Sequence, residues 1–99
     1  MNCIATEHAY YRAKERFGWN HKVLDKMMGK AFNEGIAHGD TKGTLNRYVT
    51  KLWFSHKFCN NIRIYGEVIF FFAKNELITL YQIEPKLRKH LKTNKDGIK

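Results

Sequence analysis

The stretch "NIRIYGEVIFFFAKNELITLYQI", residues 61–83, decides the fold of this 99-residue chain. It is rich in Ile, Val, Phe and Tyr, the residue types that favour β-strands. Two turn candidates divide it, at Gly66-Glu67 and at Lys74-Asn75. We therefore predict three antiparallel strands that follow one another as a meander.

The polarity of these strands predicts which of their faces are buried. In the first strand, Ile62 and Ile64 alternate with Arg63 and Tyr65, so one face is expected to be polar. The middle strand contains "VIFFFA", residues 68–73, which is apolar on both faces. This pattern suits a central strand that is covered by helices.

The segment "TEHAYYRAKERF", residues 6–17, predicts a first helix. Thr6 is a suitable N-cap and Gly18 a suitable stop. One side of this helix is apolar and is assigned to the core: Ala9, Tyr10, Ala13 and Phe17. Next to that side runs a stripe of basic residues spaced by four, which we expect to lean toward the sheet: His8, Arg12 and Arg16.

Two more helices are predicted before the sheet. "WNHKVLDKMMGKAFNEGI", residues 19–36, has Asn20 as its cap, Gly35 as its stop and a buried stripe formed by Val23, Leu24, Met27, Met28, Ala31 and Phe32. Residues 37–44 are predicted to be a polar loop. A third helix with Thr44 as its cap is predicted from the spacing of Leu45, Tyr48, Val49, Leu52 and Trp53.

Helices that precede a small antiparallel sheet predict an α+β fold in two layers, with two or three N-terminal helices packed on the meander. After Pro85, "KLRKHLK", residues 86–92, predicts a short basic C-terminal helix. We expect residues 1–92 to form one compact domain and residues 93–99 to form a basic, flexible tail.

The net charge is +9, from 18 Lys and Arg against 9 Asp and Glu. Such a charge attracts polyanions, so nucleic acid is the leading class of partner, and the alternative is a basic protein without one. Residues 68–73 form the longest apolar run, which is too short to span a membrane, and no signal sequence is recognised. Two cysteines do not make a disulfide framework, so a reduced, cytoplasmic protein is expected.

A metal or cofactor is not expected. The histidines and cysteines are scattered, and the pair His56 and Cys59 lacks a second pair at a zinc-site spacing. The acids Glu67, Glu76 and Glu84 fall at turns or strand ends and form no cluster that would hold Mg²⁺. This argues against a metal-dependent nuclease.

The remaining residue types suit RNA cleavage without a metal. A histidine can exchange the protons, arginines can hold the phosphate, and a tyrosine can stack on a base or bind a phosphate. The catalytic candidates are His8, Arg12, Arg16 and Tyr81. The nucleic-acid-binding candidates are Arg63, Tyr65, Lys51, Lys57, Lys86, Arg88 and Lys89. The same residues would also suit binding without cleavage, and the stripe on the first helix could be a solvated surface.

The motif "HAYYRAKER", residues 8–16, together with the C-terminal "NIRIYG", resembles a group of small uncharacterised proteins of phages, prophages and low-GC Gram-positive bacteria. The resemblance covers about residues 5–90. More remotely, the layout is similar to the barnase–EndoU–colicin–RelE nuclease superfamily, in which N-terminal helices pack on an antiparallel meander. That resemblance implies metal-independent RNase chemistry. In it, His8 would be the acid/base, Arg12 and Arg16 would bind phosphate, and Arg63 and Tyr81 would be the partners on the strands.

The leading hypothesis is a metal-independent endoribonuclease, or RelE-like toxin-type RNA-binding domain, encoded by a phage or prophage and acting in the cytoplasm of a bacterial host cell. Its partners would be RNA or another nucleic acid, together with a protein antitoxin. Two alternatives stay open: a non-catalytic nucleic-acid-binding regulator, and a phage-encoded inhibitor that binds a host defence complex of the CRISPR type. The +9 charge argues against an inhibitor that mimics nucleic acid, which would be acidic.

Overall fold

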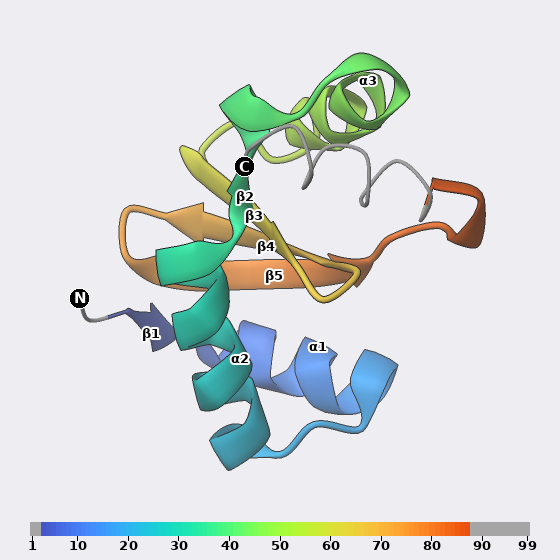
Figure 1. The fold of residues 1–99 in the computed structure, drawn as a ribbon. Helices are drawn as coiled ribbons and strands as arrows, with labels where there is room; N and C mark the ends of the chain where they lie inside the picture. The colour runs from blue at the N-terminus through green and yellow to red at the C-terminus, as the bar shows by residue number, and fades with distance from the viewer. Residues whose placement is uncertain (1–2, 88–99) are drawn as a thin grey trace.

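A computed structural model describes residues 3–87 and confirms the predicted α+β fold (Figure 1). Within these residues, three helices and a five-stranded sheet follow the order β1 (Ile4–Ala5), α1 (Glu7–Phe17), α2 (His21–Glu34), β2 (Ile36–Ala37), α3 (Gly43–Trp53), β3 (Asn61–Tyr65), β4 (Val68–Ala73) and β5 (Glu76–Gln82). Short 3₁₀ turns cover His38–Asp40 and Pro85–Leu87. None of the described helices is both long enough and apolar enough to cross a membrane.

The sheet contains the predicted meander and one short strand on each side of it. Strands β3, β4 and β5 are antiparallel neighbours, and the turns fall at Gly66-Glu67 and at Lys74-Asn75, as expected. The strand order is β1-β5-β4-β3-β2. Strand β1 pairs in parallel with the start of β5, and β2 pairs antiparallel with β3, so the sheet is mixed. The sequence did not predict these two edge strands, and β2 spans the boundary between the predicted second helix segment, 19–36, and the predicted loop, 37–44.

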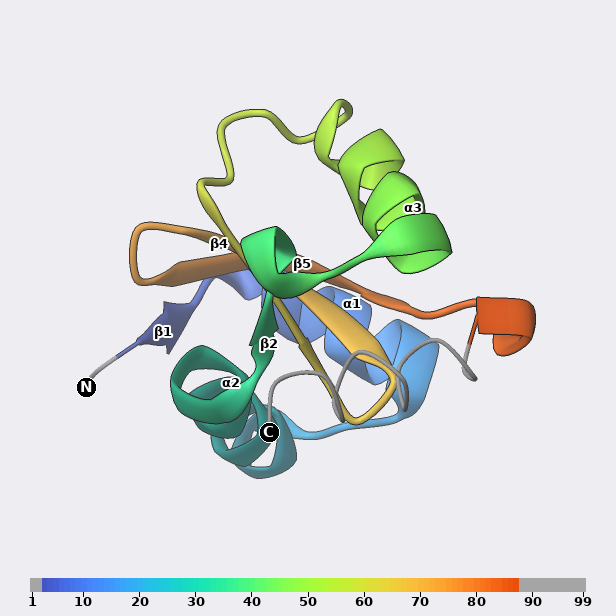
Figure 2. The ribbon, with the colours of Figure 1, turned by 45° about the horizontal axis from the view of Figure 1, so that its top comes forward.

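Helices cover both faces of the sheet, so the prediction of two layers is wrong and the fold has three. Figures 1 and 2 show α1 and α2 on one face and α3 on the other. Successive side chains of β4 point to opposite faces. Phe70 and Phe72 belong to the core beneath α1 and α2, whereas Ile69 and Phe71 belong to the core beneath α3. Both apolar faces therefore need a helical cover.

Local sequence signals fix the ends of the first two helices. The Thr6 hydroxyl accepts a hydrogen bond from the Ala9 N–H at 3.2 Å, and the Asn20 side chain accepts one from the Val23 N–H at 2.9 Å. Gly18 ends α1 with a φ of 69°, a conformation in which glycine has no steric penalty. These caps confirm the predicted starts of both helices.

Two details of the helix predictions are wrong. Val23 was assigned to the buried stripe of α2, but it is 39% exposed because it lies at the margin of the face that Leu24, Met28 and Ala31 bury. Thr44 is expected to cap α3, but the N-cap position is Lys42, two residues earlier, and the helix starts at Gly43.

The predicted basic helix over 86–92 lies mostly outside the described residues, as do the tail 93–99 and the candidates Arg88 and Lys89. The part that is described forms the 3₁₀ turn Pro85–Leu87, whose Leu87 is buried in the core on the α3 side.

Candidate nucleic-acid interface

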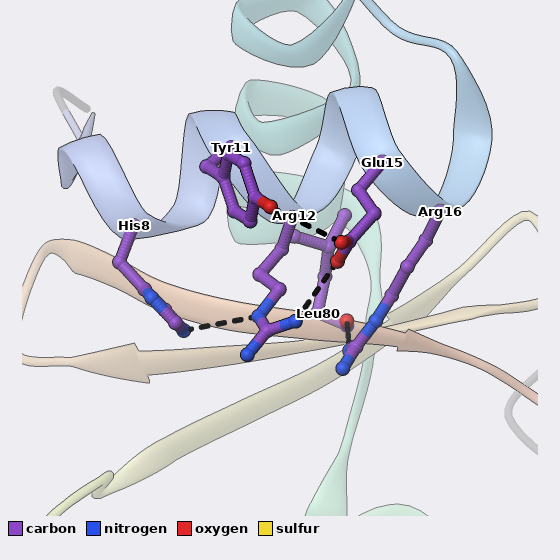
Figure 3. A network of polar contacts seen from close by, with 6 residues as sticks. All are labelled: His8, Tyr11, Arg12, Glu15, Arg16 and Leu80. Carbon is purple, nitrogen blue, oxygen red and sulfur yellow. Dashed lines mark hydrogen bonds and ion pairs between the residues drawn. The ribbon is translucent and has the colours of Figure 1, made fainter.

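The site is built on the outer edge of β5. Strand β1 covers only the beginning of this edge, where Ile4 pairs with Glu76 and Ala5 with Leu77. In the described part of the chain, the rest of β5 has no strand neighbour on that side. An exposed strand edge is usually protected by charged side chains or by a covering element. Here α1 packs against β5 and presents its basic stripe to the edge (Figure 3).

Arg16 binds this edge directly. Its Nη1 donates a hydrogen bond to the Leu80 carbonyl oxygen at 2.8 Å. Its guanidinium carbon lies 4.5 Å from the centre of the Tyr81 ring, within the range of a cation–π contact. Among the described residues, Arg16 has no carboxylate partner. A guanidinium carries five N–H donors, so Arg16 keeps donors and an unpaired positive charge for an incoming anion.

The other end of the stripe is already hydrogen-bonded within the helix. Arg12 Nε donates to His8 Nε2 at 3.4 Å, and Arg12 Nη1 forms an ion pair with Glu15 at 2.9 Å. The Tyr11 hydroxyl donates to the other Glu15 oxygen at 3.3 Å. The Glu15 carboxylate offsets part of the charge at this end, so Arg16 is the more available cation.

The three basic side chains extend from α1 toward β5, and the His8 ring and the Arg16 side chain both lean toward Arg12 between them (Figure 3). Eight residues separate His8 from Arg16, which is about 12 Å along a helix axis. At its base on the helix the stripe is therefore long enough to contact more than one phosphate of a polymer.

Tyr81 connects the stripe to a residue from the other side of the sheet, His56. The His56 Nε2 and the Tyr81 hydroxyl are 3.0 Å apart, and their rings are separated by 5.8 Å. The His56 ring also packs against buried Phe71 at 5.1 Å. Burial lowers the pKa of His56 from its ordinary value of 6.5, so the ring is neutral at pH 7. A neutral imidazole can accept a proton.

Sequence reasoning missed His56. It considered this residue only as half of a metal pair with Cys59, and burial instead raises the pKa of the Cys59 thiol. His56 and Tyr81 are 25 residues apart in the chain. No local pattern indicates that a loop histidine meets a strand tyrosine, and only the reversal of the chain between α3 and β5 brings them together.

Two other candidates lie elsewhere. Arg63 and Tyr65 are on β3, which β4 separates from β5. Two strand spacings amount to about 10 Å. Arg63 donates to the Asn61 side chain at 2.8 Å and to the Gly35 carbonyl at 3.5 Å, and Tyr65 packs against the core on the α1 and α2 side. The structure therefore does not bring these two residues to the stripe on α1.

The lysine candidates are dispersed. Lys51 is exposed on α3, and Lys57 lies over the Phe54 ring at 5.2 Å in the loop that also carries His56. Lys86 pairs with Glu84 at 3.4 Å. Within residues 3–87, no group of three or more His, Cys, Asp or Glu side chains is placed to hold a metal ion.

Comparison of the chain with protein-family models, with curated proteins and with solved structures finds no match in any of the three. The resemblances drawn from the sequence thus stay predictions, and the function is argued from the chemistry of the β5 edge.

Proposed function

We propose that this protein binds RNA along the open edge of β5 and cleaves it as a metal-independent endoribonuclease. The observation that carries the proposal is the contact of a guanidinium, a phenol and a neutral imidazole from three separate segments: Arg16, Tyr81 and His56. RNA transesterification needs a cation for the phosphate, which Arg16 supplies, and a base for the 2′-hydroxyl, which His56 supplies through the Tyr81 hydroxyl.

The proposed reaction begins with a phosphate bound to the free donors of Arg16. The Tyr81 hydroxyl passes its proton to His56 Nε2 as it takes the proton of the substrate 2′-hydroxyl. The 2′ oxygen then forms a bond to phosphorus while the bond from phosphorus to the 5′ oxygen breaks. Water protonates the leaving 5′ oxygen, and His56 returns its proton to solvent. The products are a 2′,3′-cyclic phosphate and a free 5′-hydroxyl.

In this proposal the roles differ from those expected from the sequence. His56 takes the acid/base role that was expected of His8. His8 and Arg12 contact a neighbouring phosphate, because they lie about one to two helical turns from Arg16. Stabilisation of the phosphate charge falls to Arg16, which unlike Arg12 has no carboxylate partner among the described residues.

A second candidate function is RNA binding without cleavage. It is favoured by the length of the stripe, which spreads His8, Arg12 and Arg16 over about 12 Å of α1, a spacing that suits contact with successive phosphates. In that case the same edge of β5 holds the phosphates and Tyr81 serves only as a contact surface. The suggested antitoxin or host defence complex, and an origin in a phage, stay predictions.

The test is to incubate the purified protein with total RNA in EDTA, beside variants His56→Ala, Arg16→Met and His21→Ala. His21, which stacks on Tyr10 away from the site, is the matched histidine control. We expect cyclic or 3′-phosphate ends from the wild type and from His21→Ala, and at least a hundredfold slower cleavage by His56→Ala. Intact RNA that is bound in a salt-sensitive way would support the non-catalytic function, and RNA that is neither bound nor cut contradicts both.

A further inference from the structure

The loop that follows α3 exposes two large aromatic rings. Phe54 is 60% exposed and Phe58 is 63% exposed. Exposed phenylalanines have no hydrogen-bonding atom that would explain their position at the surface. Two exposed phenylalanines within five residues, in a basic protein, indicate a surface on which a ligand covers aromatic rings.

The Phe58 ring is continuous with the proposed RNA site. The His56 ring lies edge-on to Phe58, with a centroid separation of 6.4 Å. His56 contacts Tyr81, and Tyr81 contacts Arg16. An uninterrupted series of side-chain contacts therefore leads from the exposed Phe58 ring to the guanidinium that is free to hold a phosphate.

Cations lie close to the Phe54 ring. Lys57 Nζ lies 5.2 Å from the centre of that ring. Phe54 also borders a shallow hollow of about 300 Å³, whose other lining residues are Asn46, Arg47, Thr50 and Lys51. An aromatic surface next to positive charges offers a face for a base and donors for the phosphate attached to it.

We propose that Phe54 and Phe58 are stacking platforms for unpaired bases, so that the RNA taken by this protein is single-stranded. This inference rests on the proposed function and adds the class of substrate. Bases in a duplex are stacked on one another and cannot offer their faces to a side chain. Stacking on phenylalanine involves no hydrogen bonds, so recognition at this loop tolerates any base sequence.

The composition of the loop favours nucleic acid over a protein partner. The core of a protein interface is depleted in lysine, whereas here Lys51 and Lys57 stand three residues before and after Phe54. A surface of anionic lipid would share the attraction to aromatic and basic side chains. The contact with His56 and Tyr81 instead directs the loop toward the groups that would act on RNA.

The test compares Phe54→Leu and Phe58→Leu with the wild-type protein, using the full chain. Leucine keeps an apolar side chain but removes the aromatic face. Ile4→Ala is the control, because Ile4 is 56% exposed and lies on β1. Fluorescence anisotropy would measure binding to a labelled single-stranded RNA and to a blunt-ended RNA duplex of the same length. We expect tighter binding of the single strand, and at least about fivefold weaker binding of it by each Phe→Leu variant, with duplex binding and melting temperature unchanged.

Equal affinity for the two RNAs, or unchanged affinity in the leucine variants, would overturn the stacking role. Binding of the wild type to phosphatidylserine vesicles that both leucine variants lose would assign the rings to a membrane surface and overturn it too. Arg16→Met separates this failure from that of the proposed function. If it weakens RNA binding while the leucine variants do not, only the platform is wrong. If it binds RNA like the wild type, the site at β5 itself is refuted.

Discussion

Replacing Arg16 with methionine tests the β5 edge most directly. Methionine retains the unbranched stem and the helix propensity of arginine but lacks its charge and its donors. The change removes the hydrogen bond to the Leu80 carbonyl and the cation–π contact with Tyr81. Lys14→Met is a matched control, because Lys14 is the other basic residue in the last turn of α1 and makes neither contact.

The expected loss of stability is small and can be worked from these contacts. Arg16 is exposed, so its hydrogen bond is worth about 0.5–1 kcal/mol and its contact with the Tyr81 ring about 0.5–1 kcal/mol. After substitution, water reaches the Leu80 carbonyl at the open edge, so no buried group is left without a partner. We expect the free energy of unfolding to fall by about 1–2 kcal/mol, which lowers the urea midpoint by about 1 M.

Binding gives a second, independent readout of the same variant. If Arg16 holds one phosphate of a single strand, the negative slope of log affinity against log salt should become shallower by about 0.7 in Arg16→Met. Urea unfolding and a salt titration of RNA binding measure the two effects. If Arg16→Met and Lys14→Met gave the same urea midpoint and the same salt slope, the reasoning about this edge would be refuted.

Three further predictions concern the fold and its response to pH. Gly35→Ala should destabilise the protein by about 2 kcal/mol, because a Cβ there would lie 2.5 Å from the Ala31 carbonyl oxygen. Gly29→Ala has open space around it in α2 and should stabilise the protein by about 0.5–1 kcal/mol. Thermal unfolding measures both variants, and equal shifts in melting temperature would contradict this contrast. Phe71→Ala, at a fully buried ring, should cost about 3–5 kcal/mol in urea unfolding, and a loss below 1 kcal/mol would be inconsistent with its place beneath α3. Burial lowers the pKa of both His56 and His38 from 6.5, so below about pH 6.5 the unfolded chain binds more protons than the folded one. Stability should therefore be full above pH 7 and decline as the pH falls toward 5. A double variant His38→Gln/His56→Gln whose unfolding midpoint declines with pH as steeply as that of the wild type would exclude these two side chains as the cause.

For the candidate site, the sequence predicted the stripe and its inclination toward the sheet. A spacing of four residues places side chains on one side of a helix, and the border with the apolar side points them at the packing partner. The meeting of Arg16 with Tyr81 fits that expectation. The sequence did not predict that Arg63 lies away from the stripe. The alternation of a strand tells which residues share a face, but not which strand lies beneath which helix.

What the sequence alone determined is local. Thr6, Gly18 and Asn20 fix helix ends because each acts on backbone groups within a few residues of itself. The turns of the meander are local for the same reason. The two apolar faces of β4 must both be buried, whichever elements cover them.

Only the tertiary structure decided the rest. Two-residue strands such as β1 and β2 are too short to show a period, and they exist because neighbours distant in the chain complete their hydrogen bonds. The contact between His56 and Tyr81 likewise depends on how α3 is laid across the sheet. Helix caps and turns involve residues near in sequence, whereas this site is assembled by packing between segments that the sequence keeps apart.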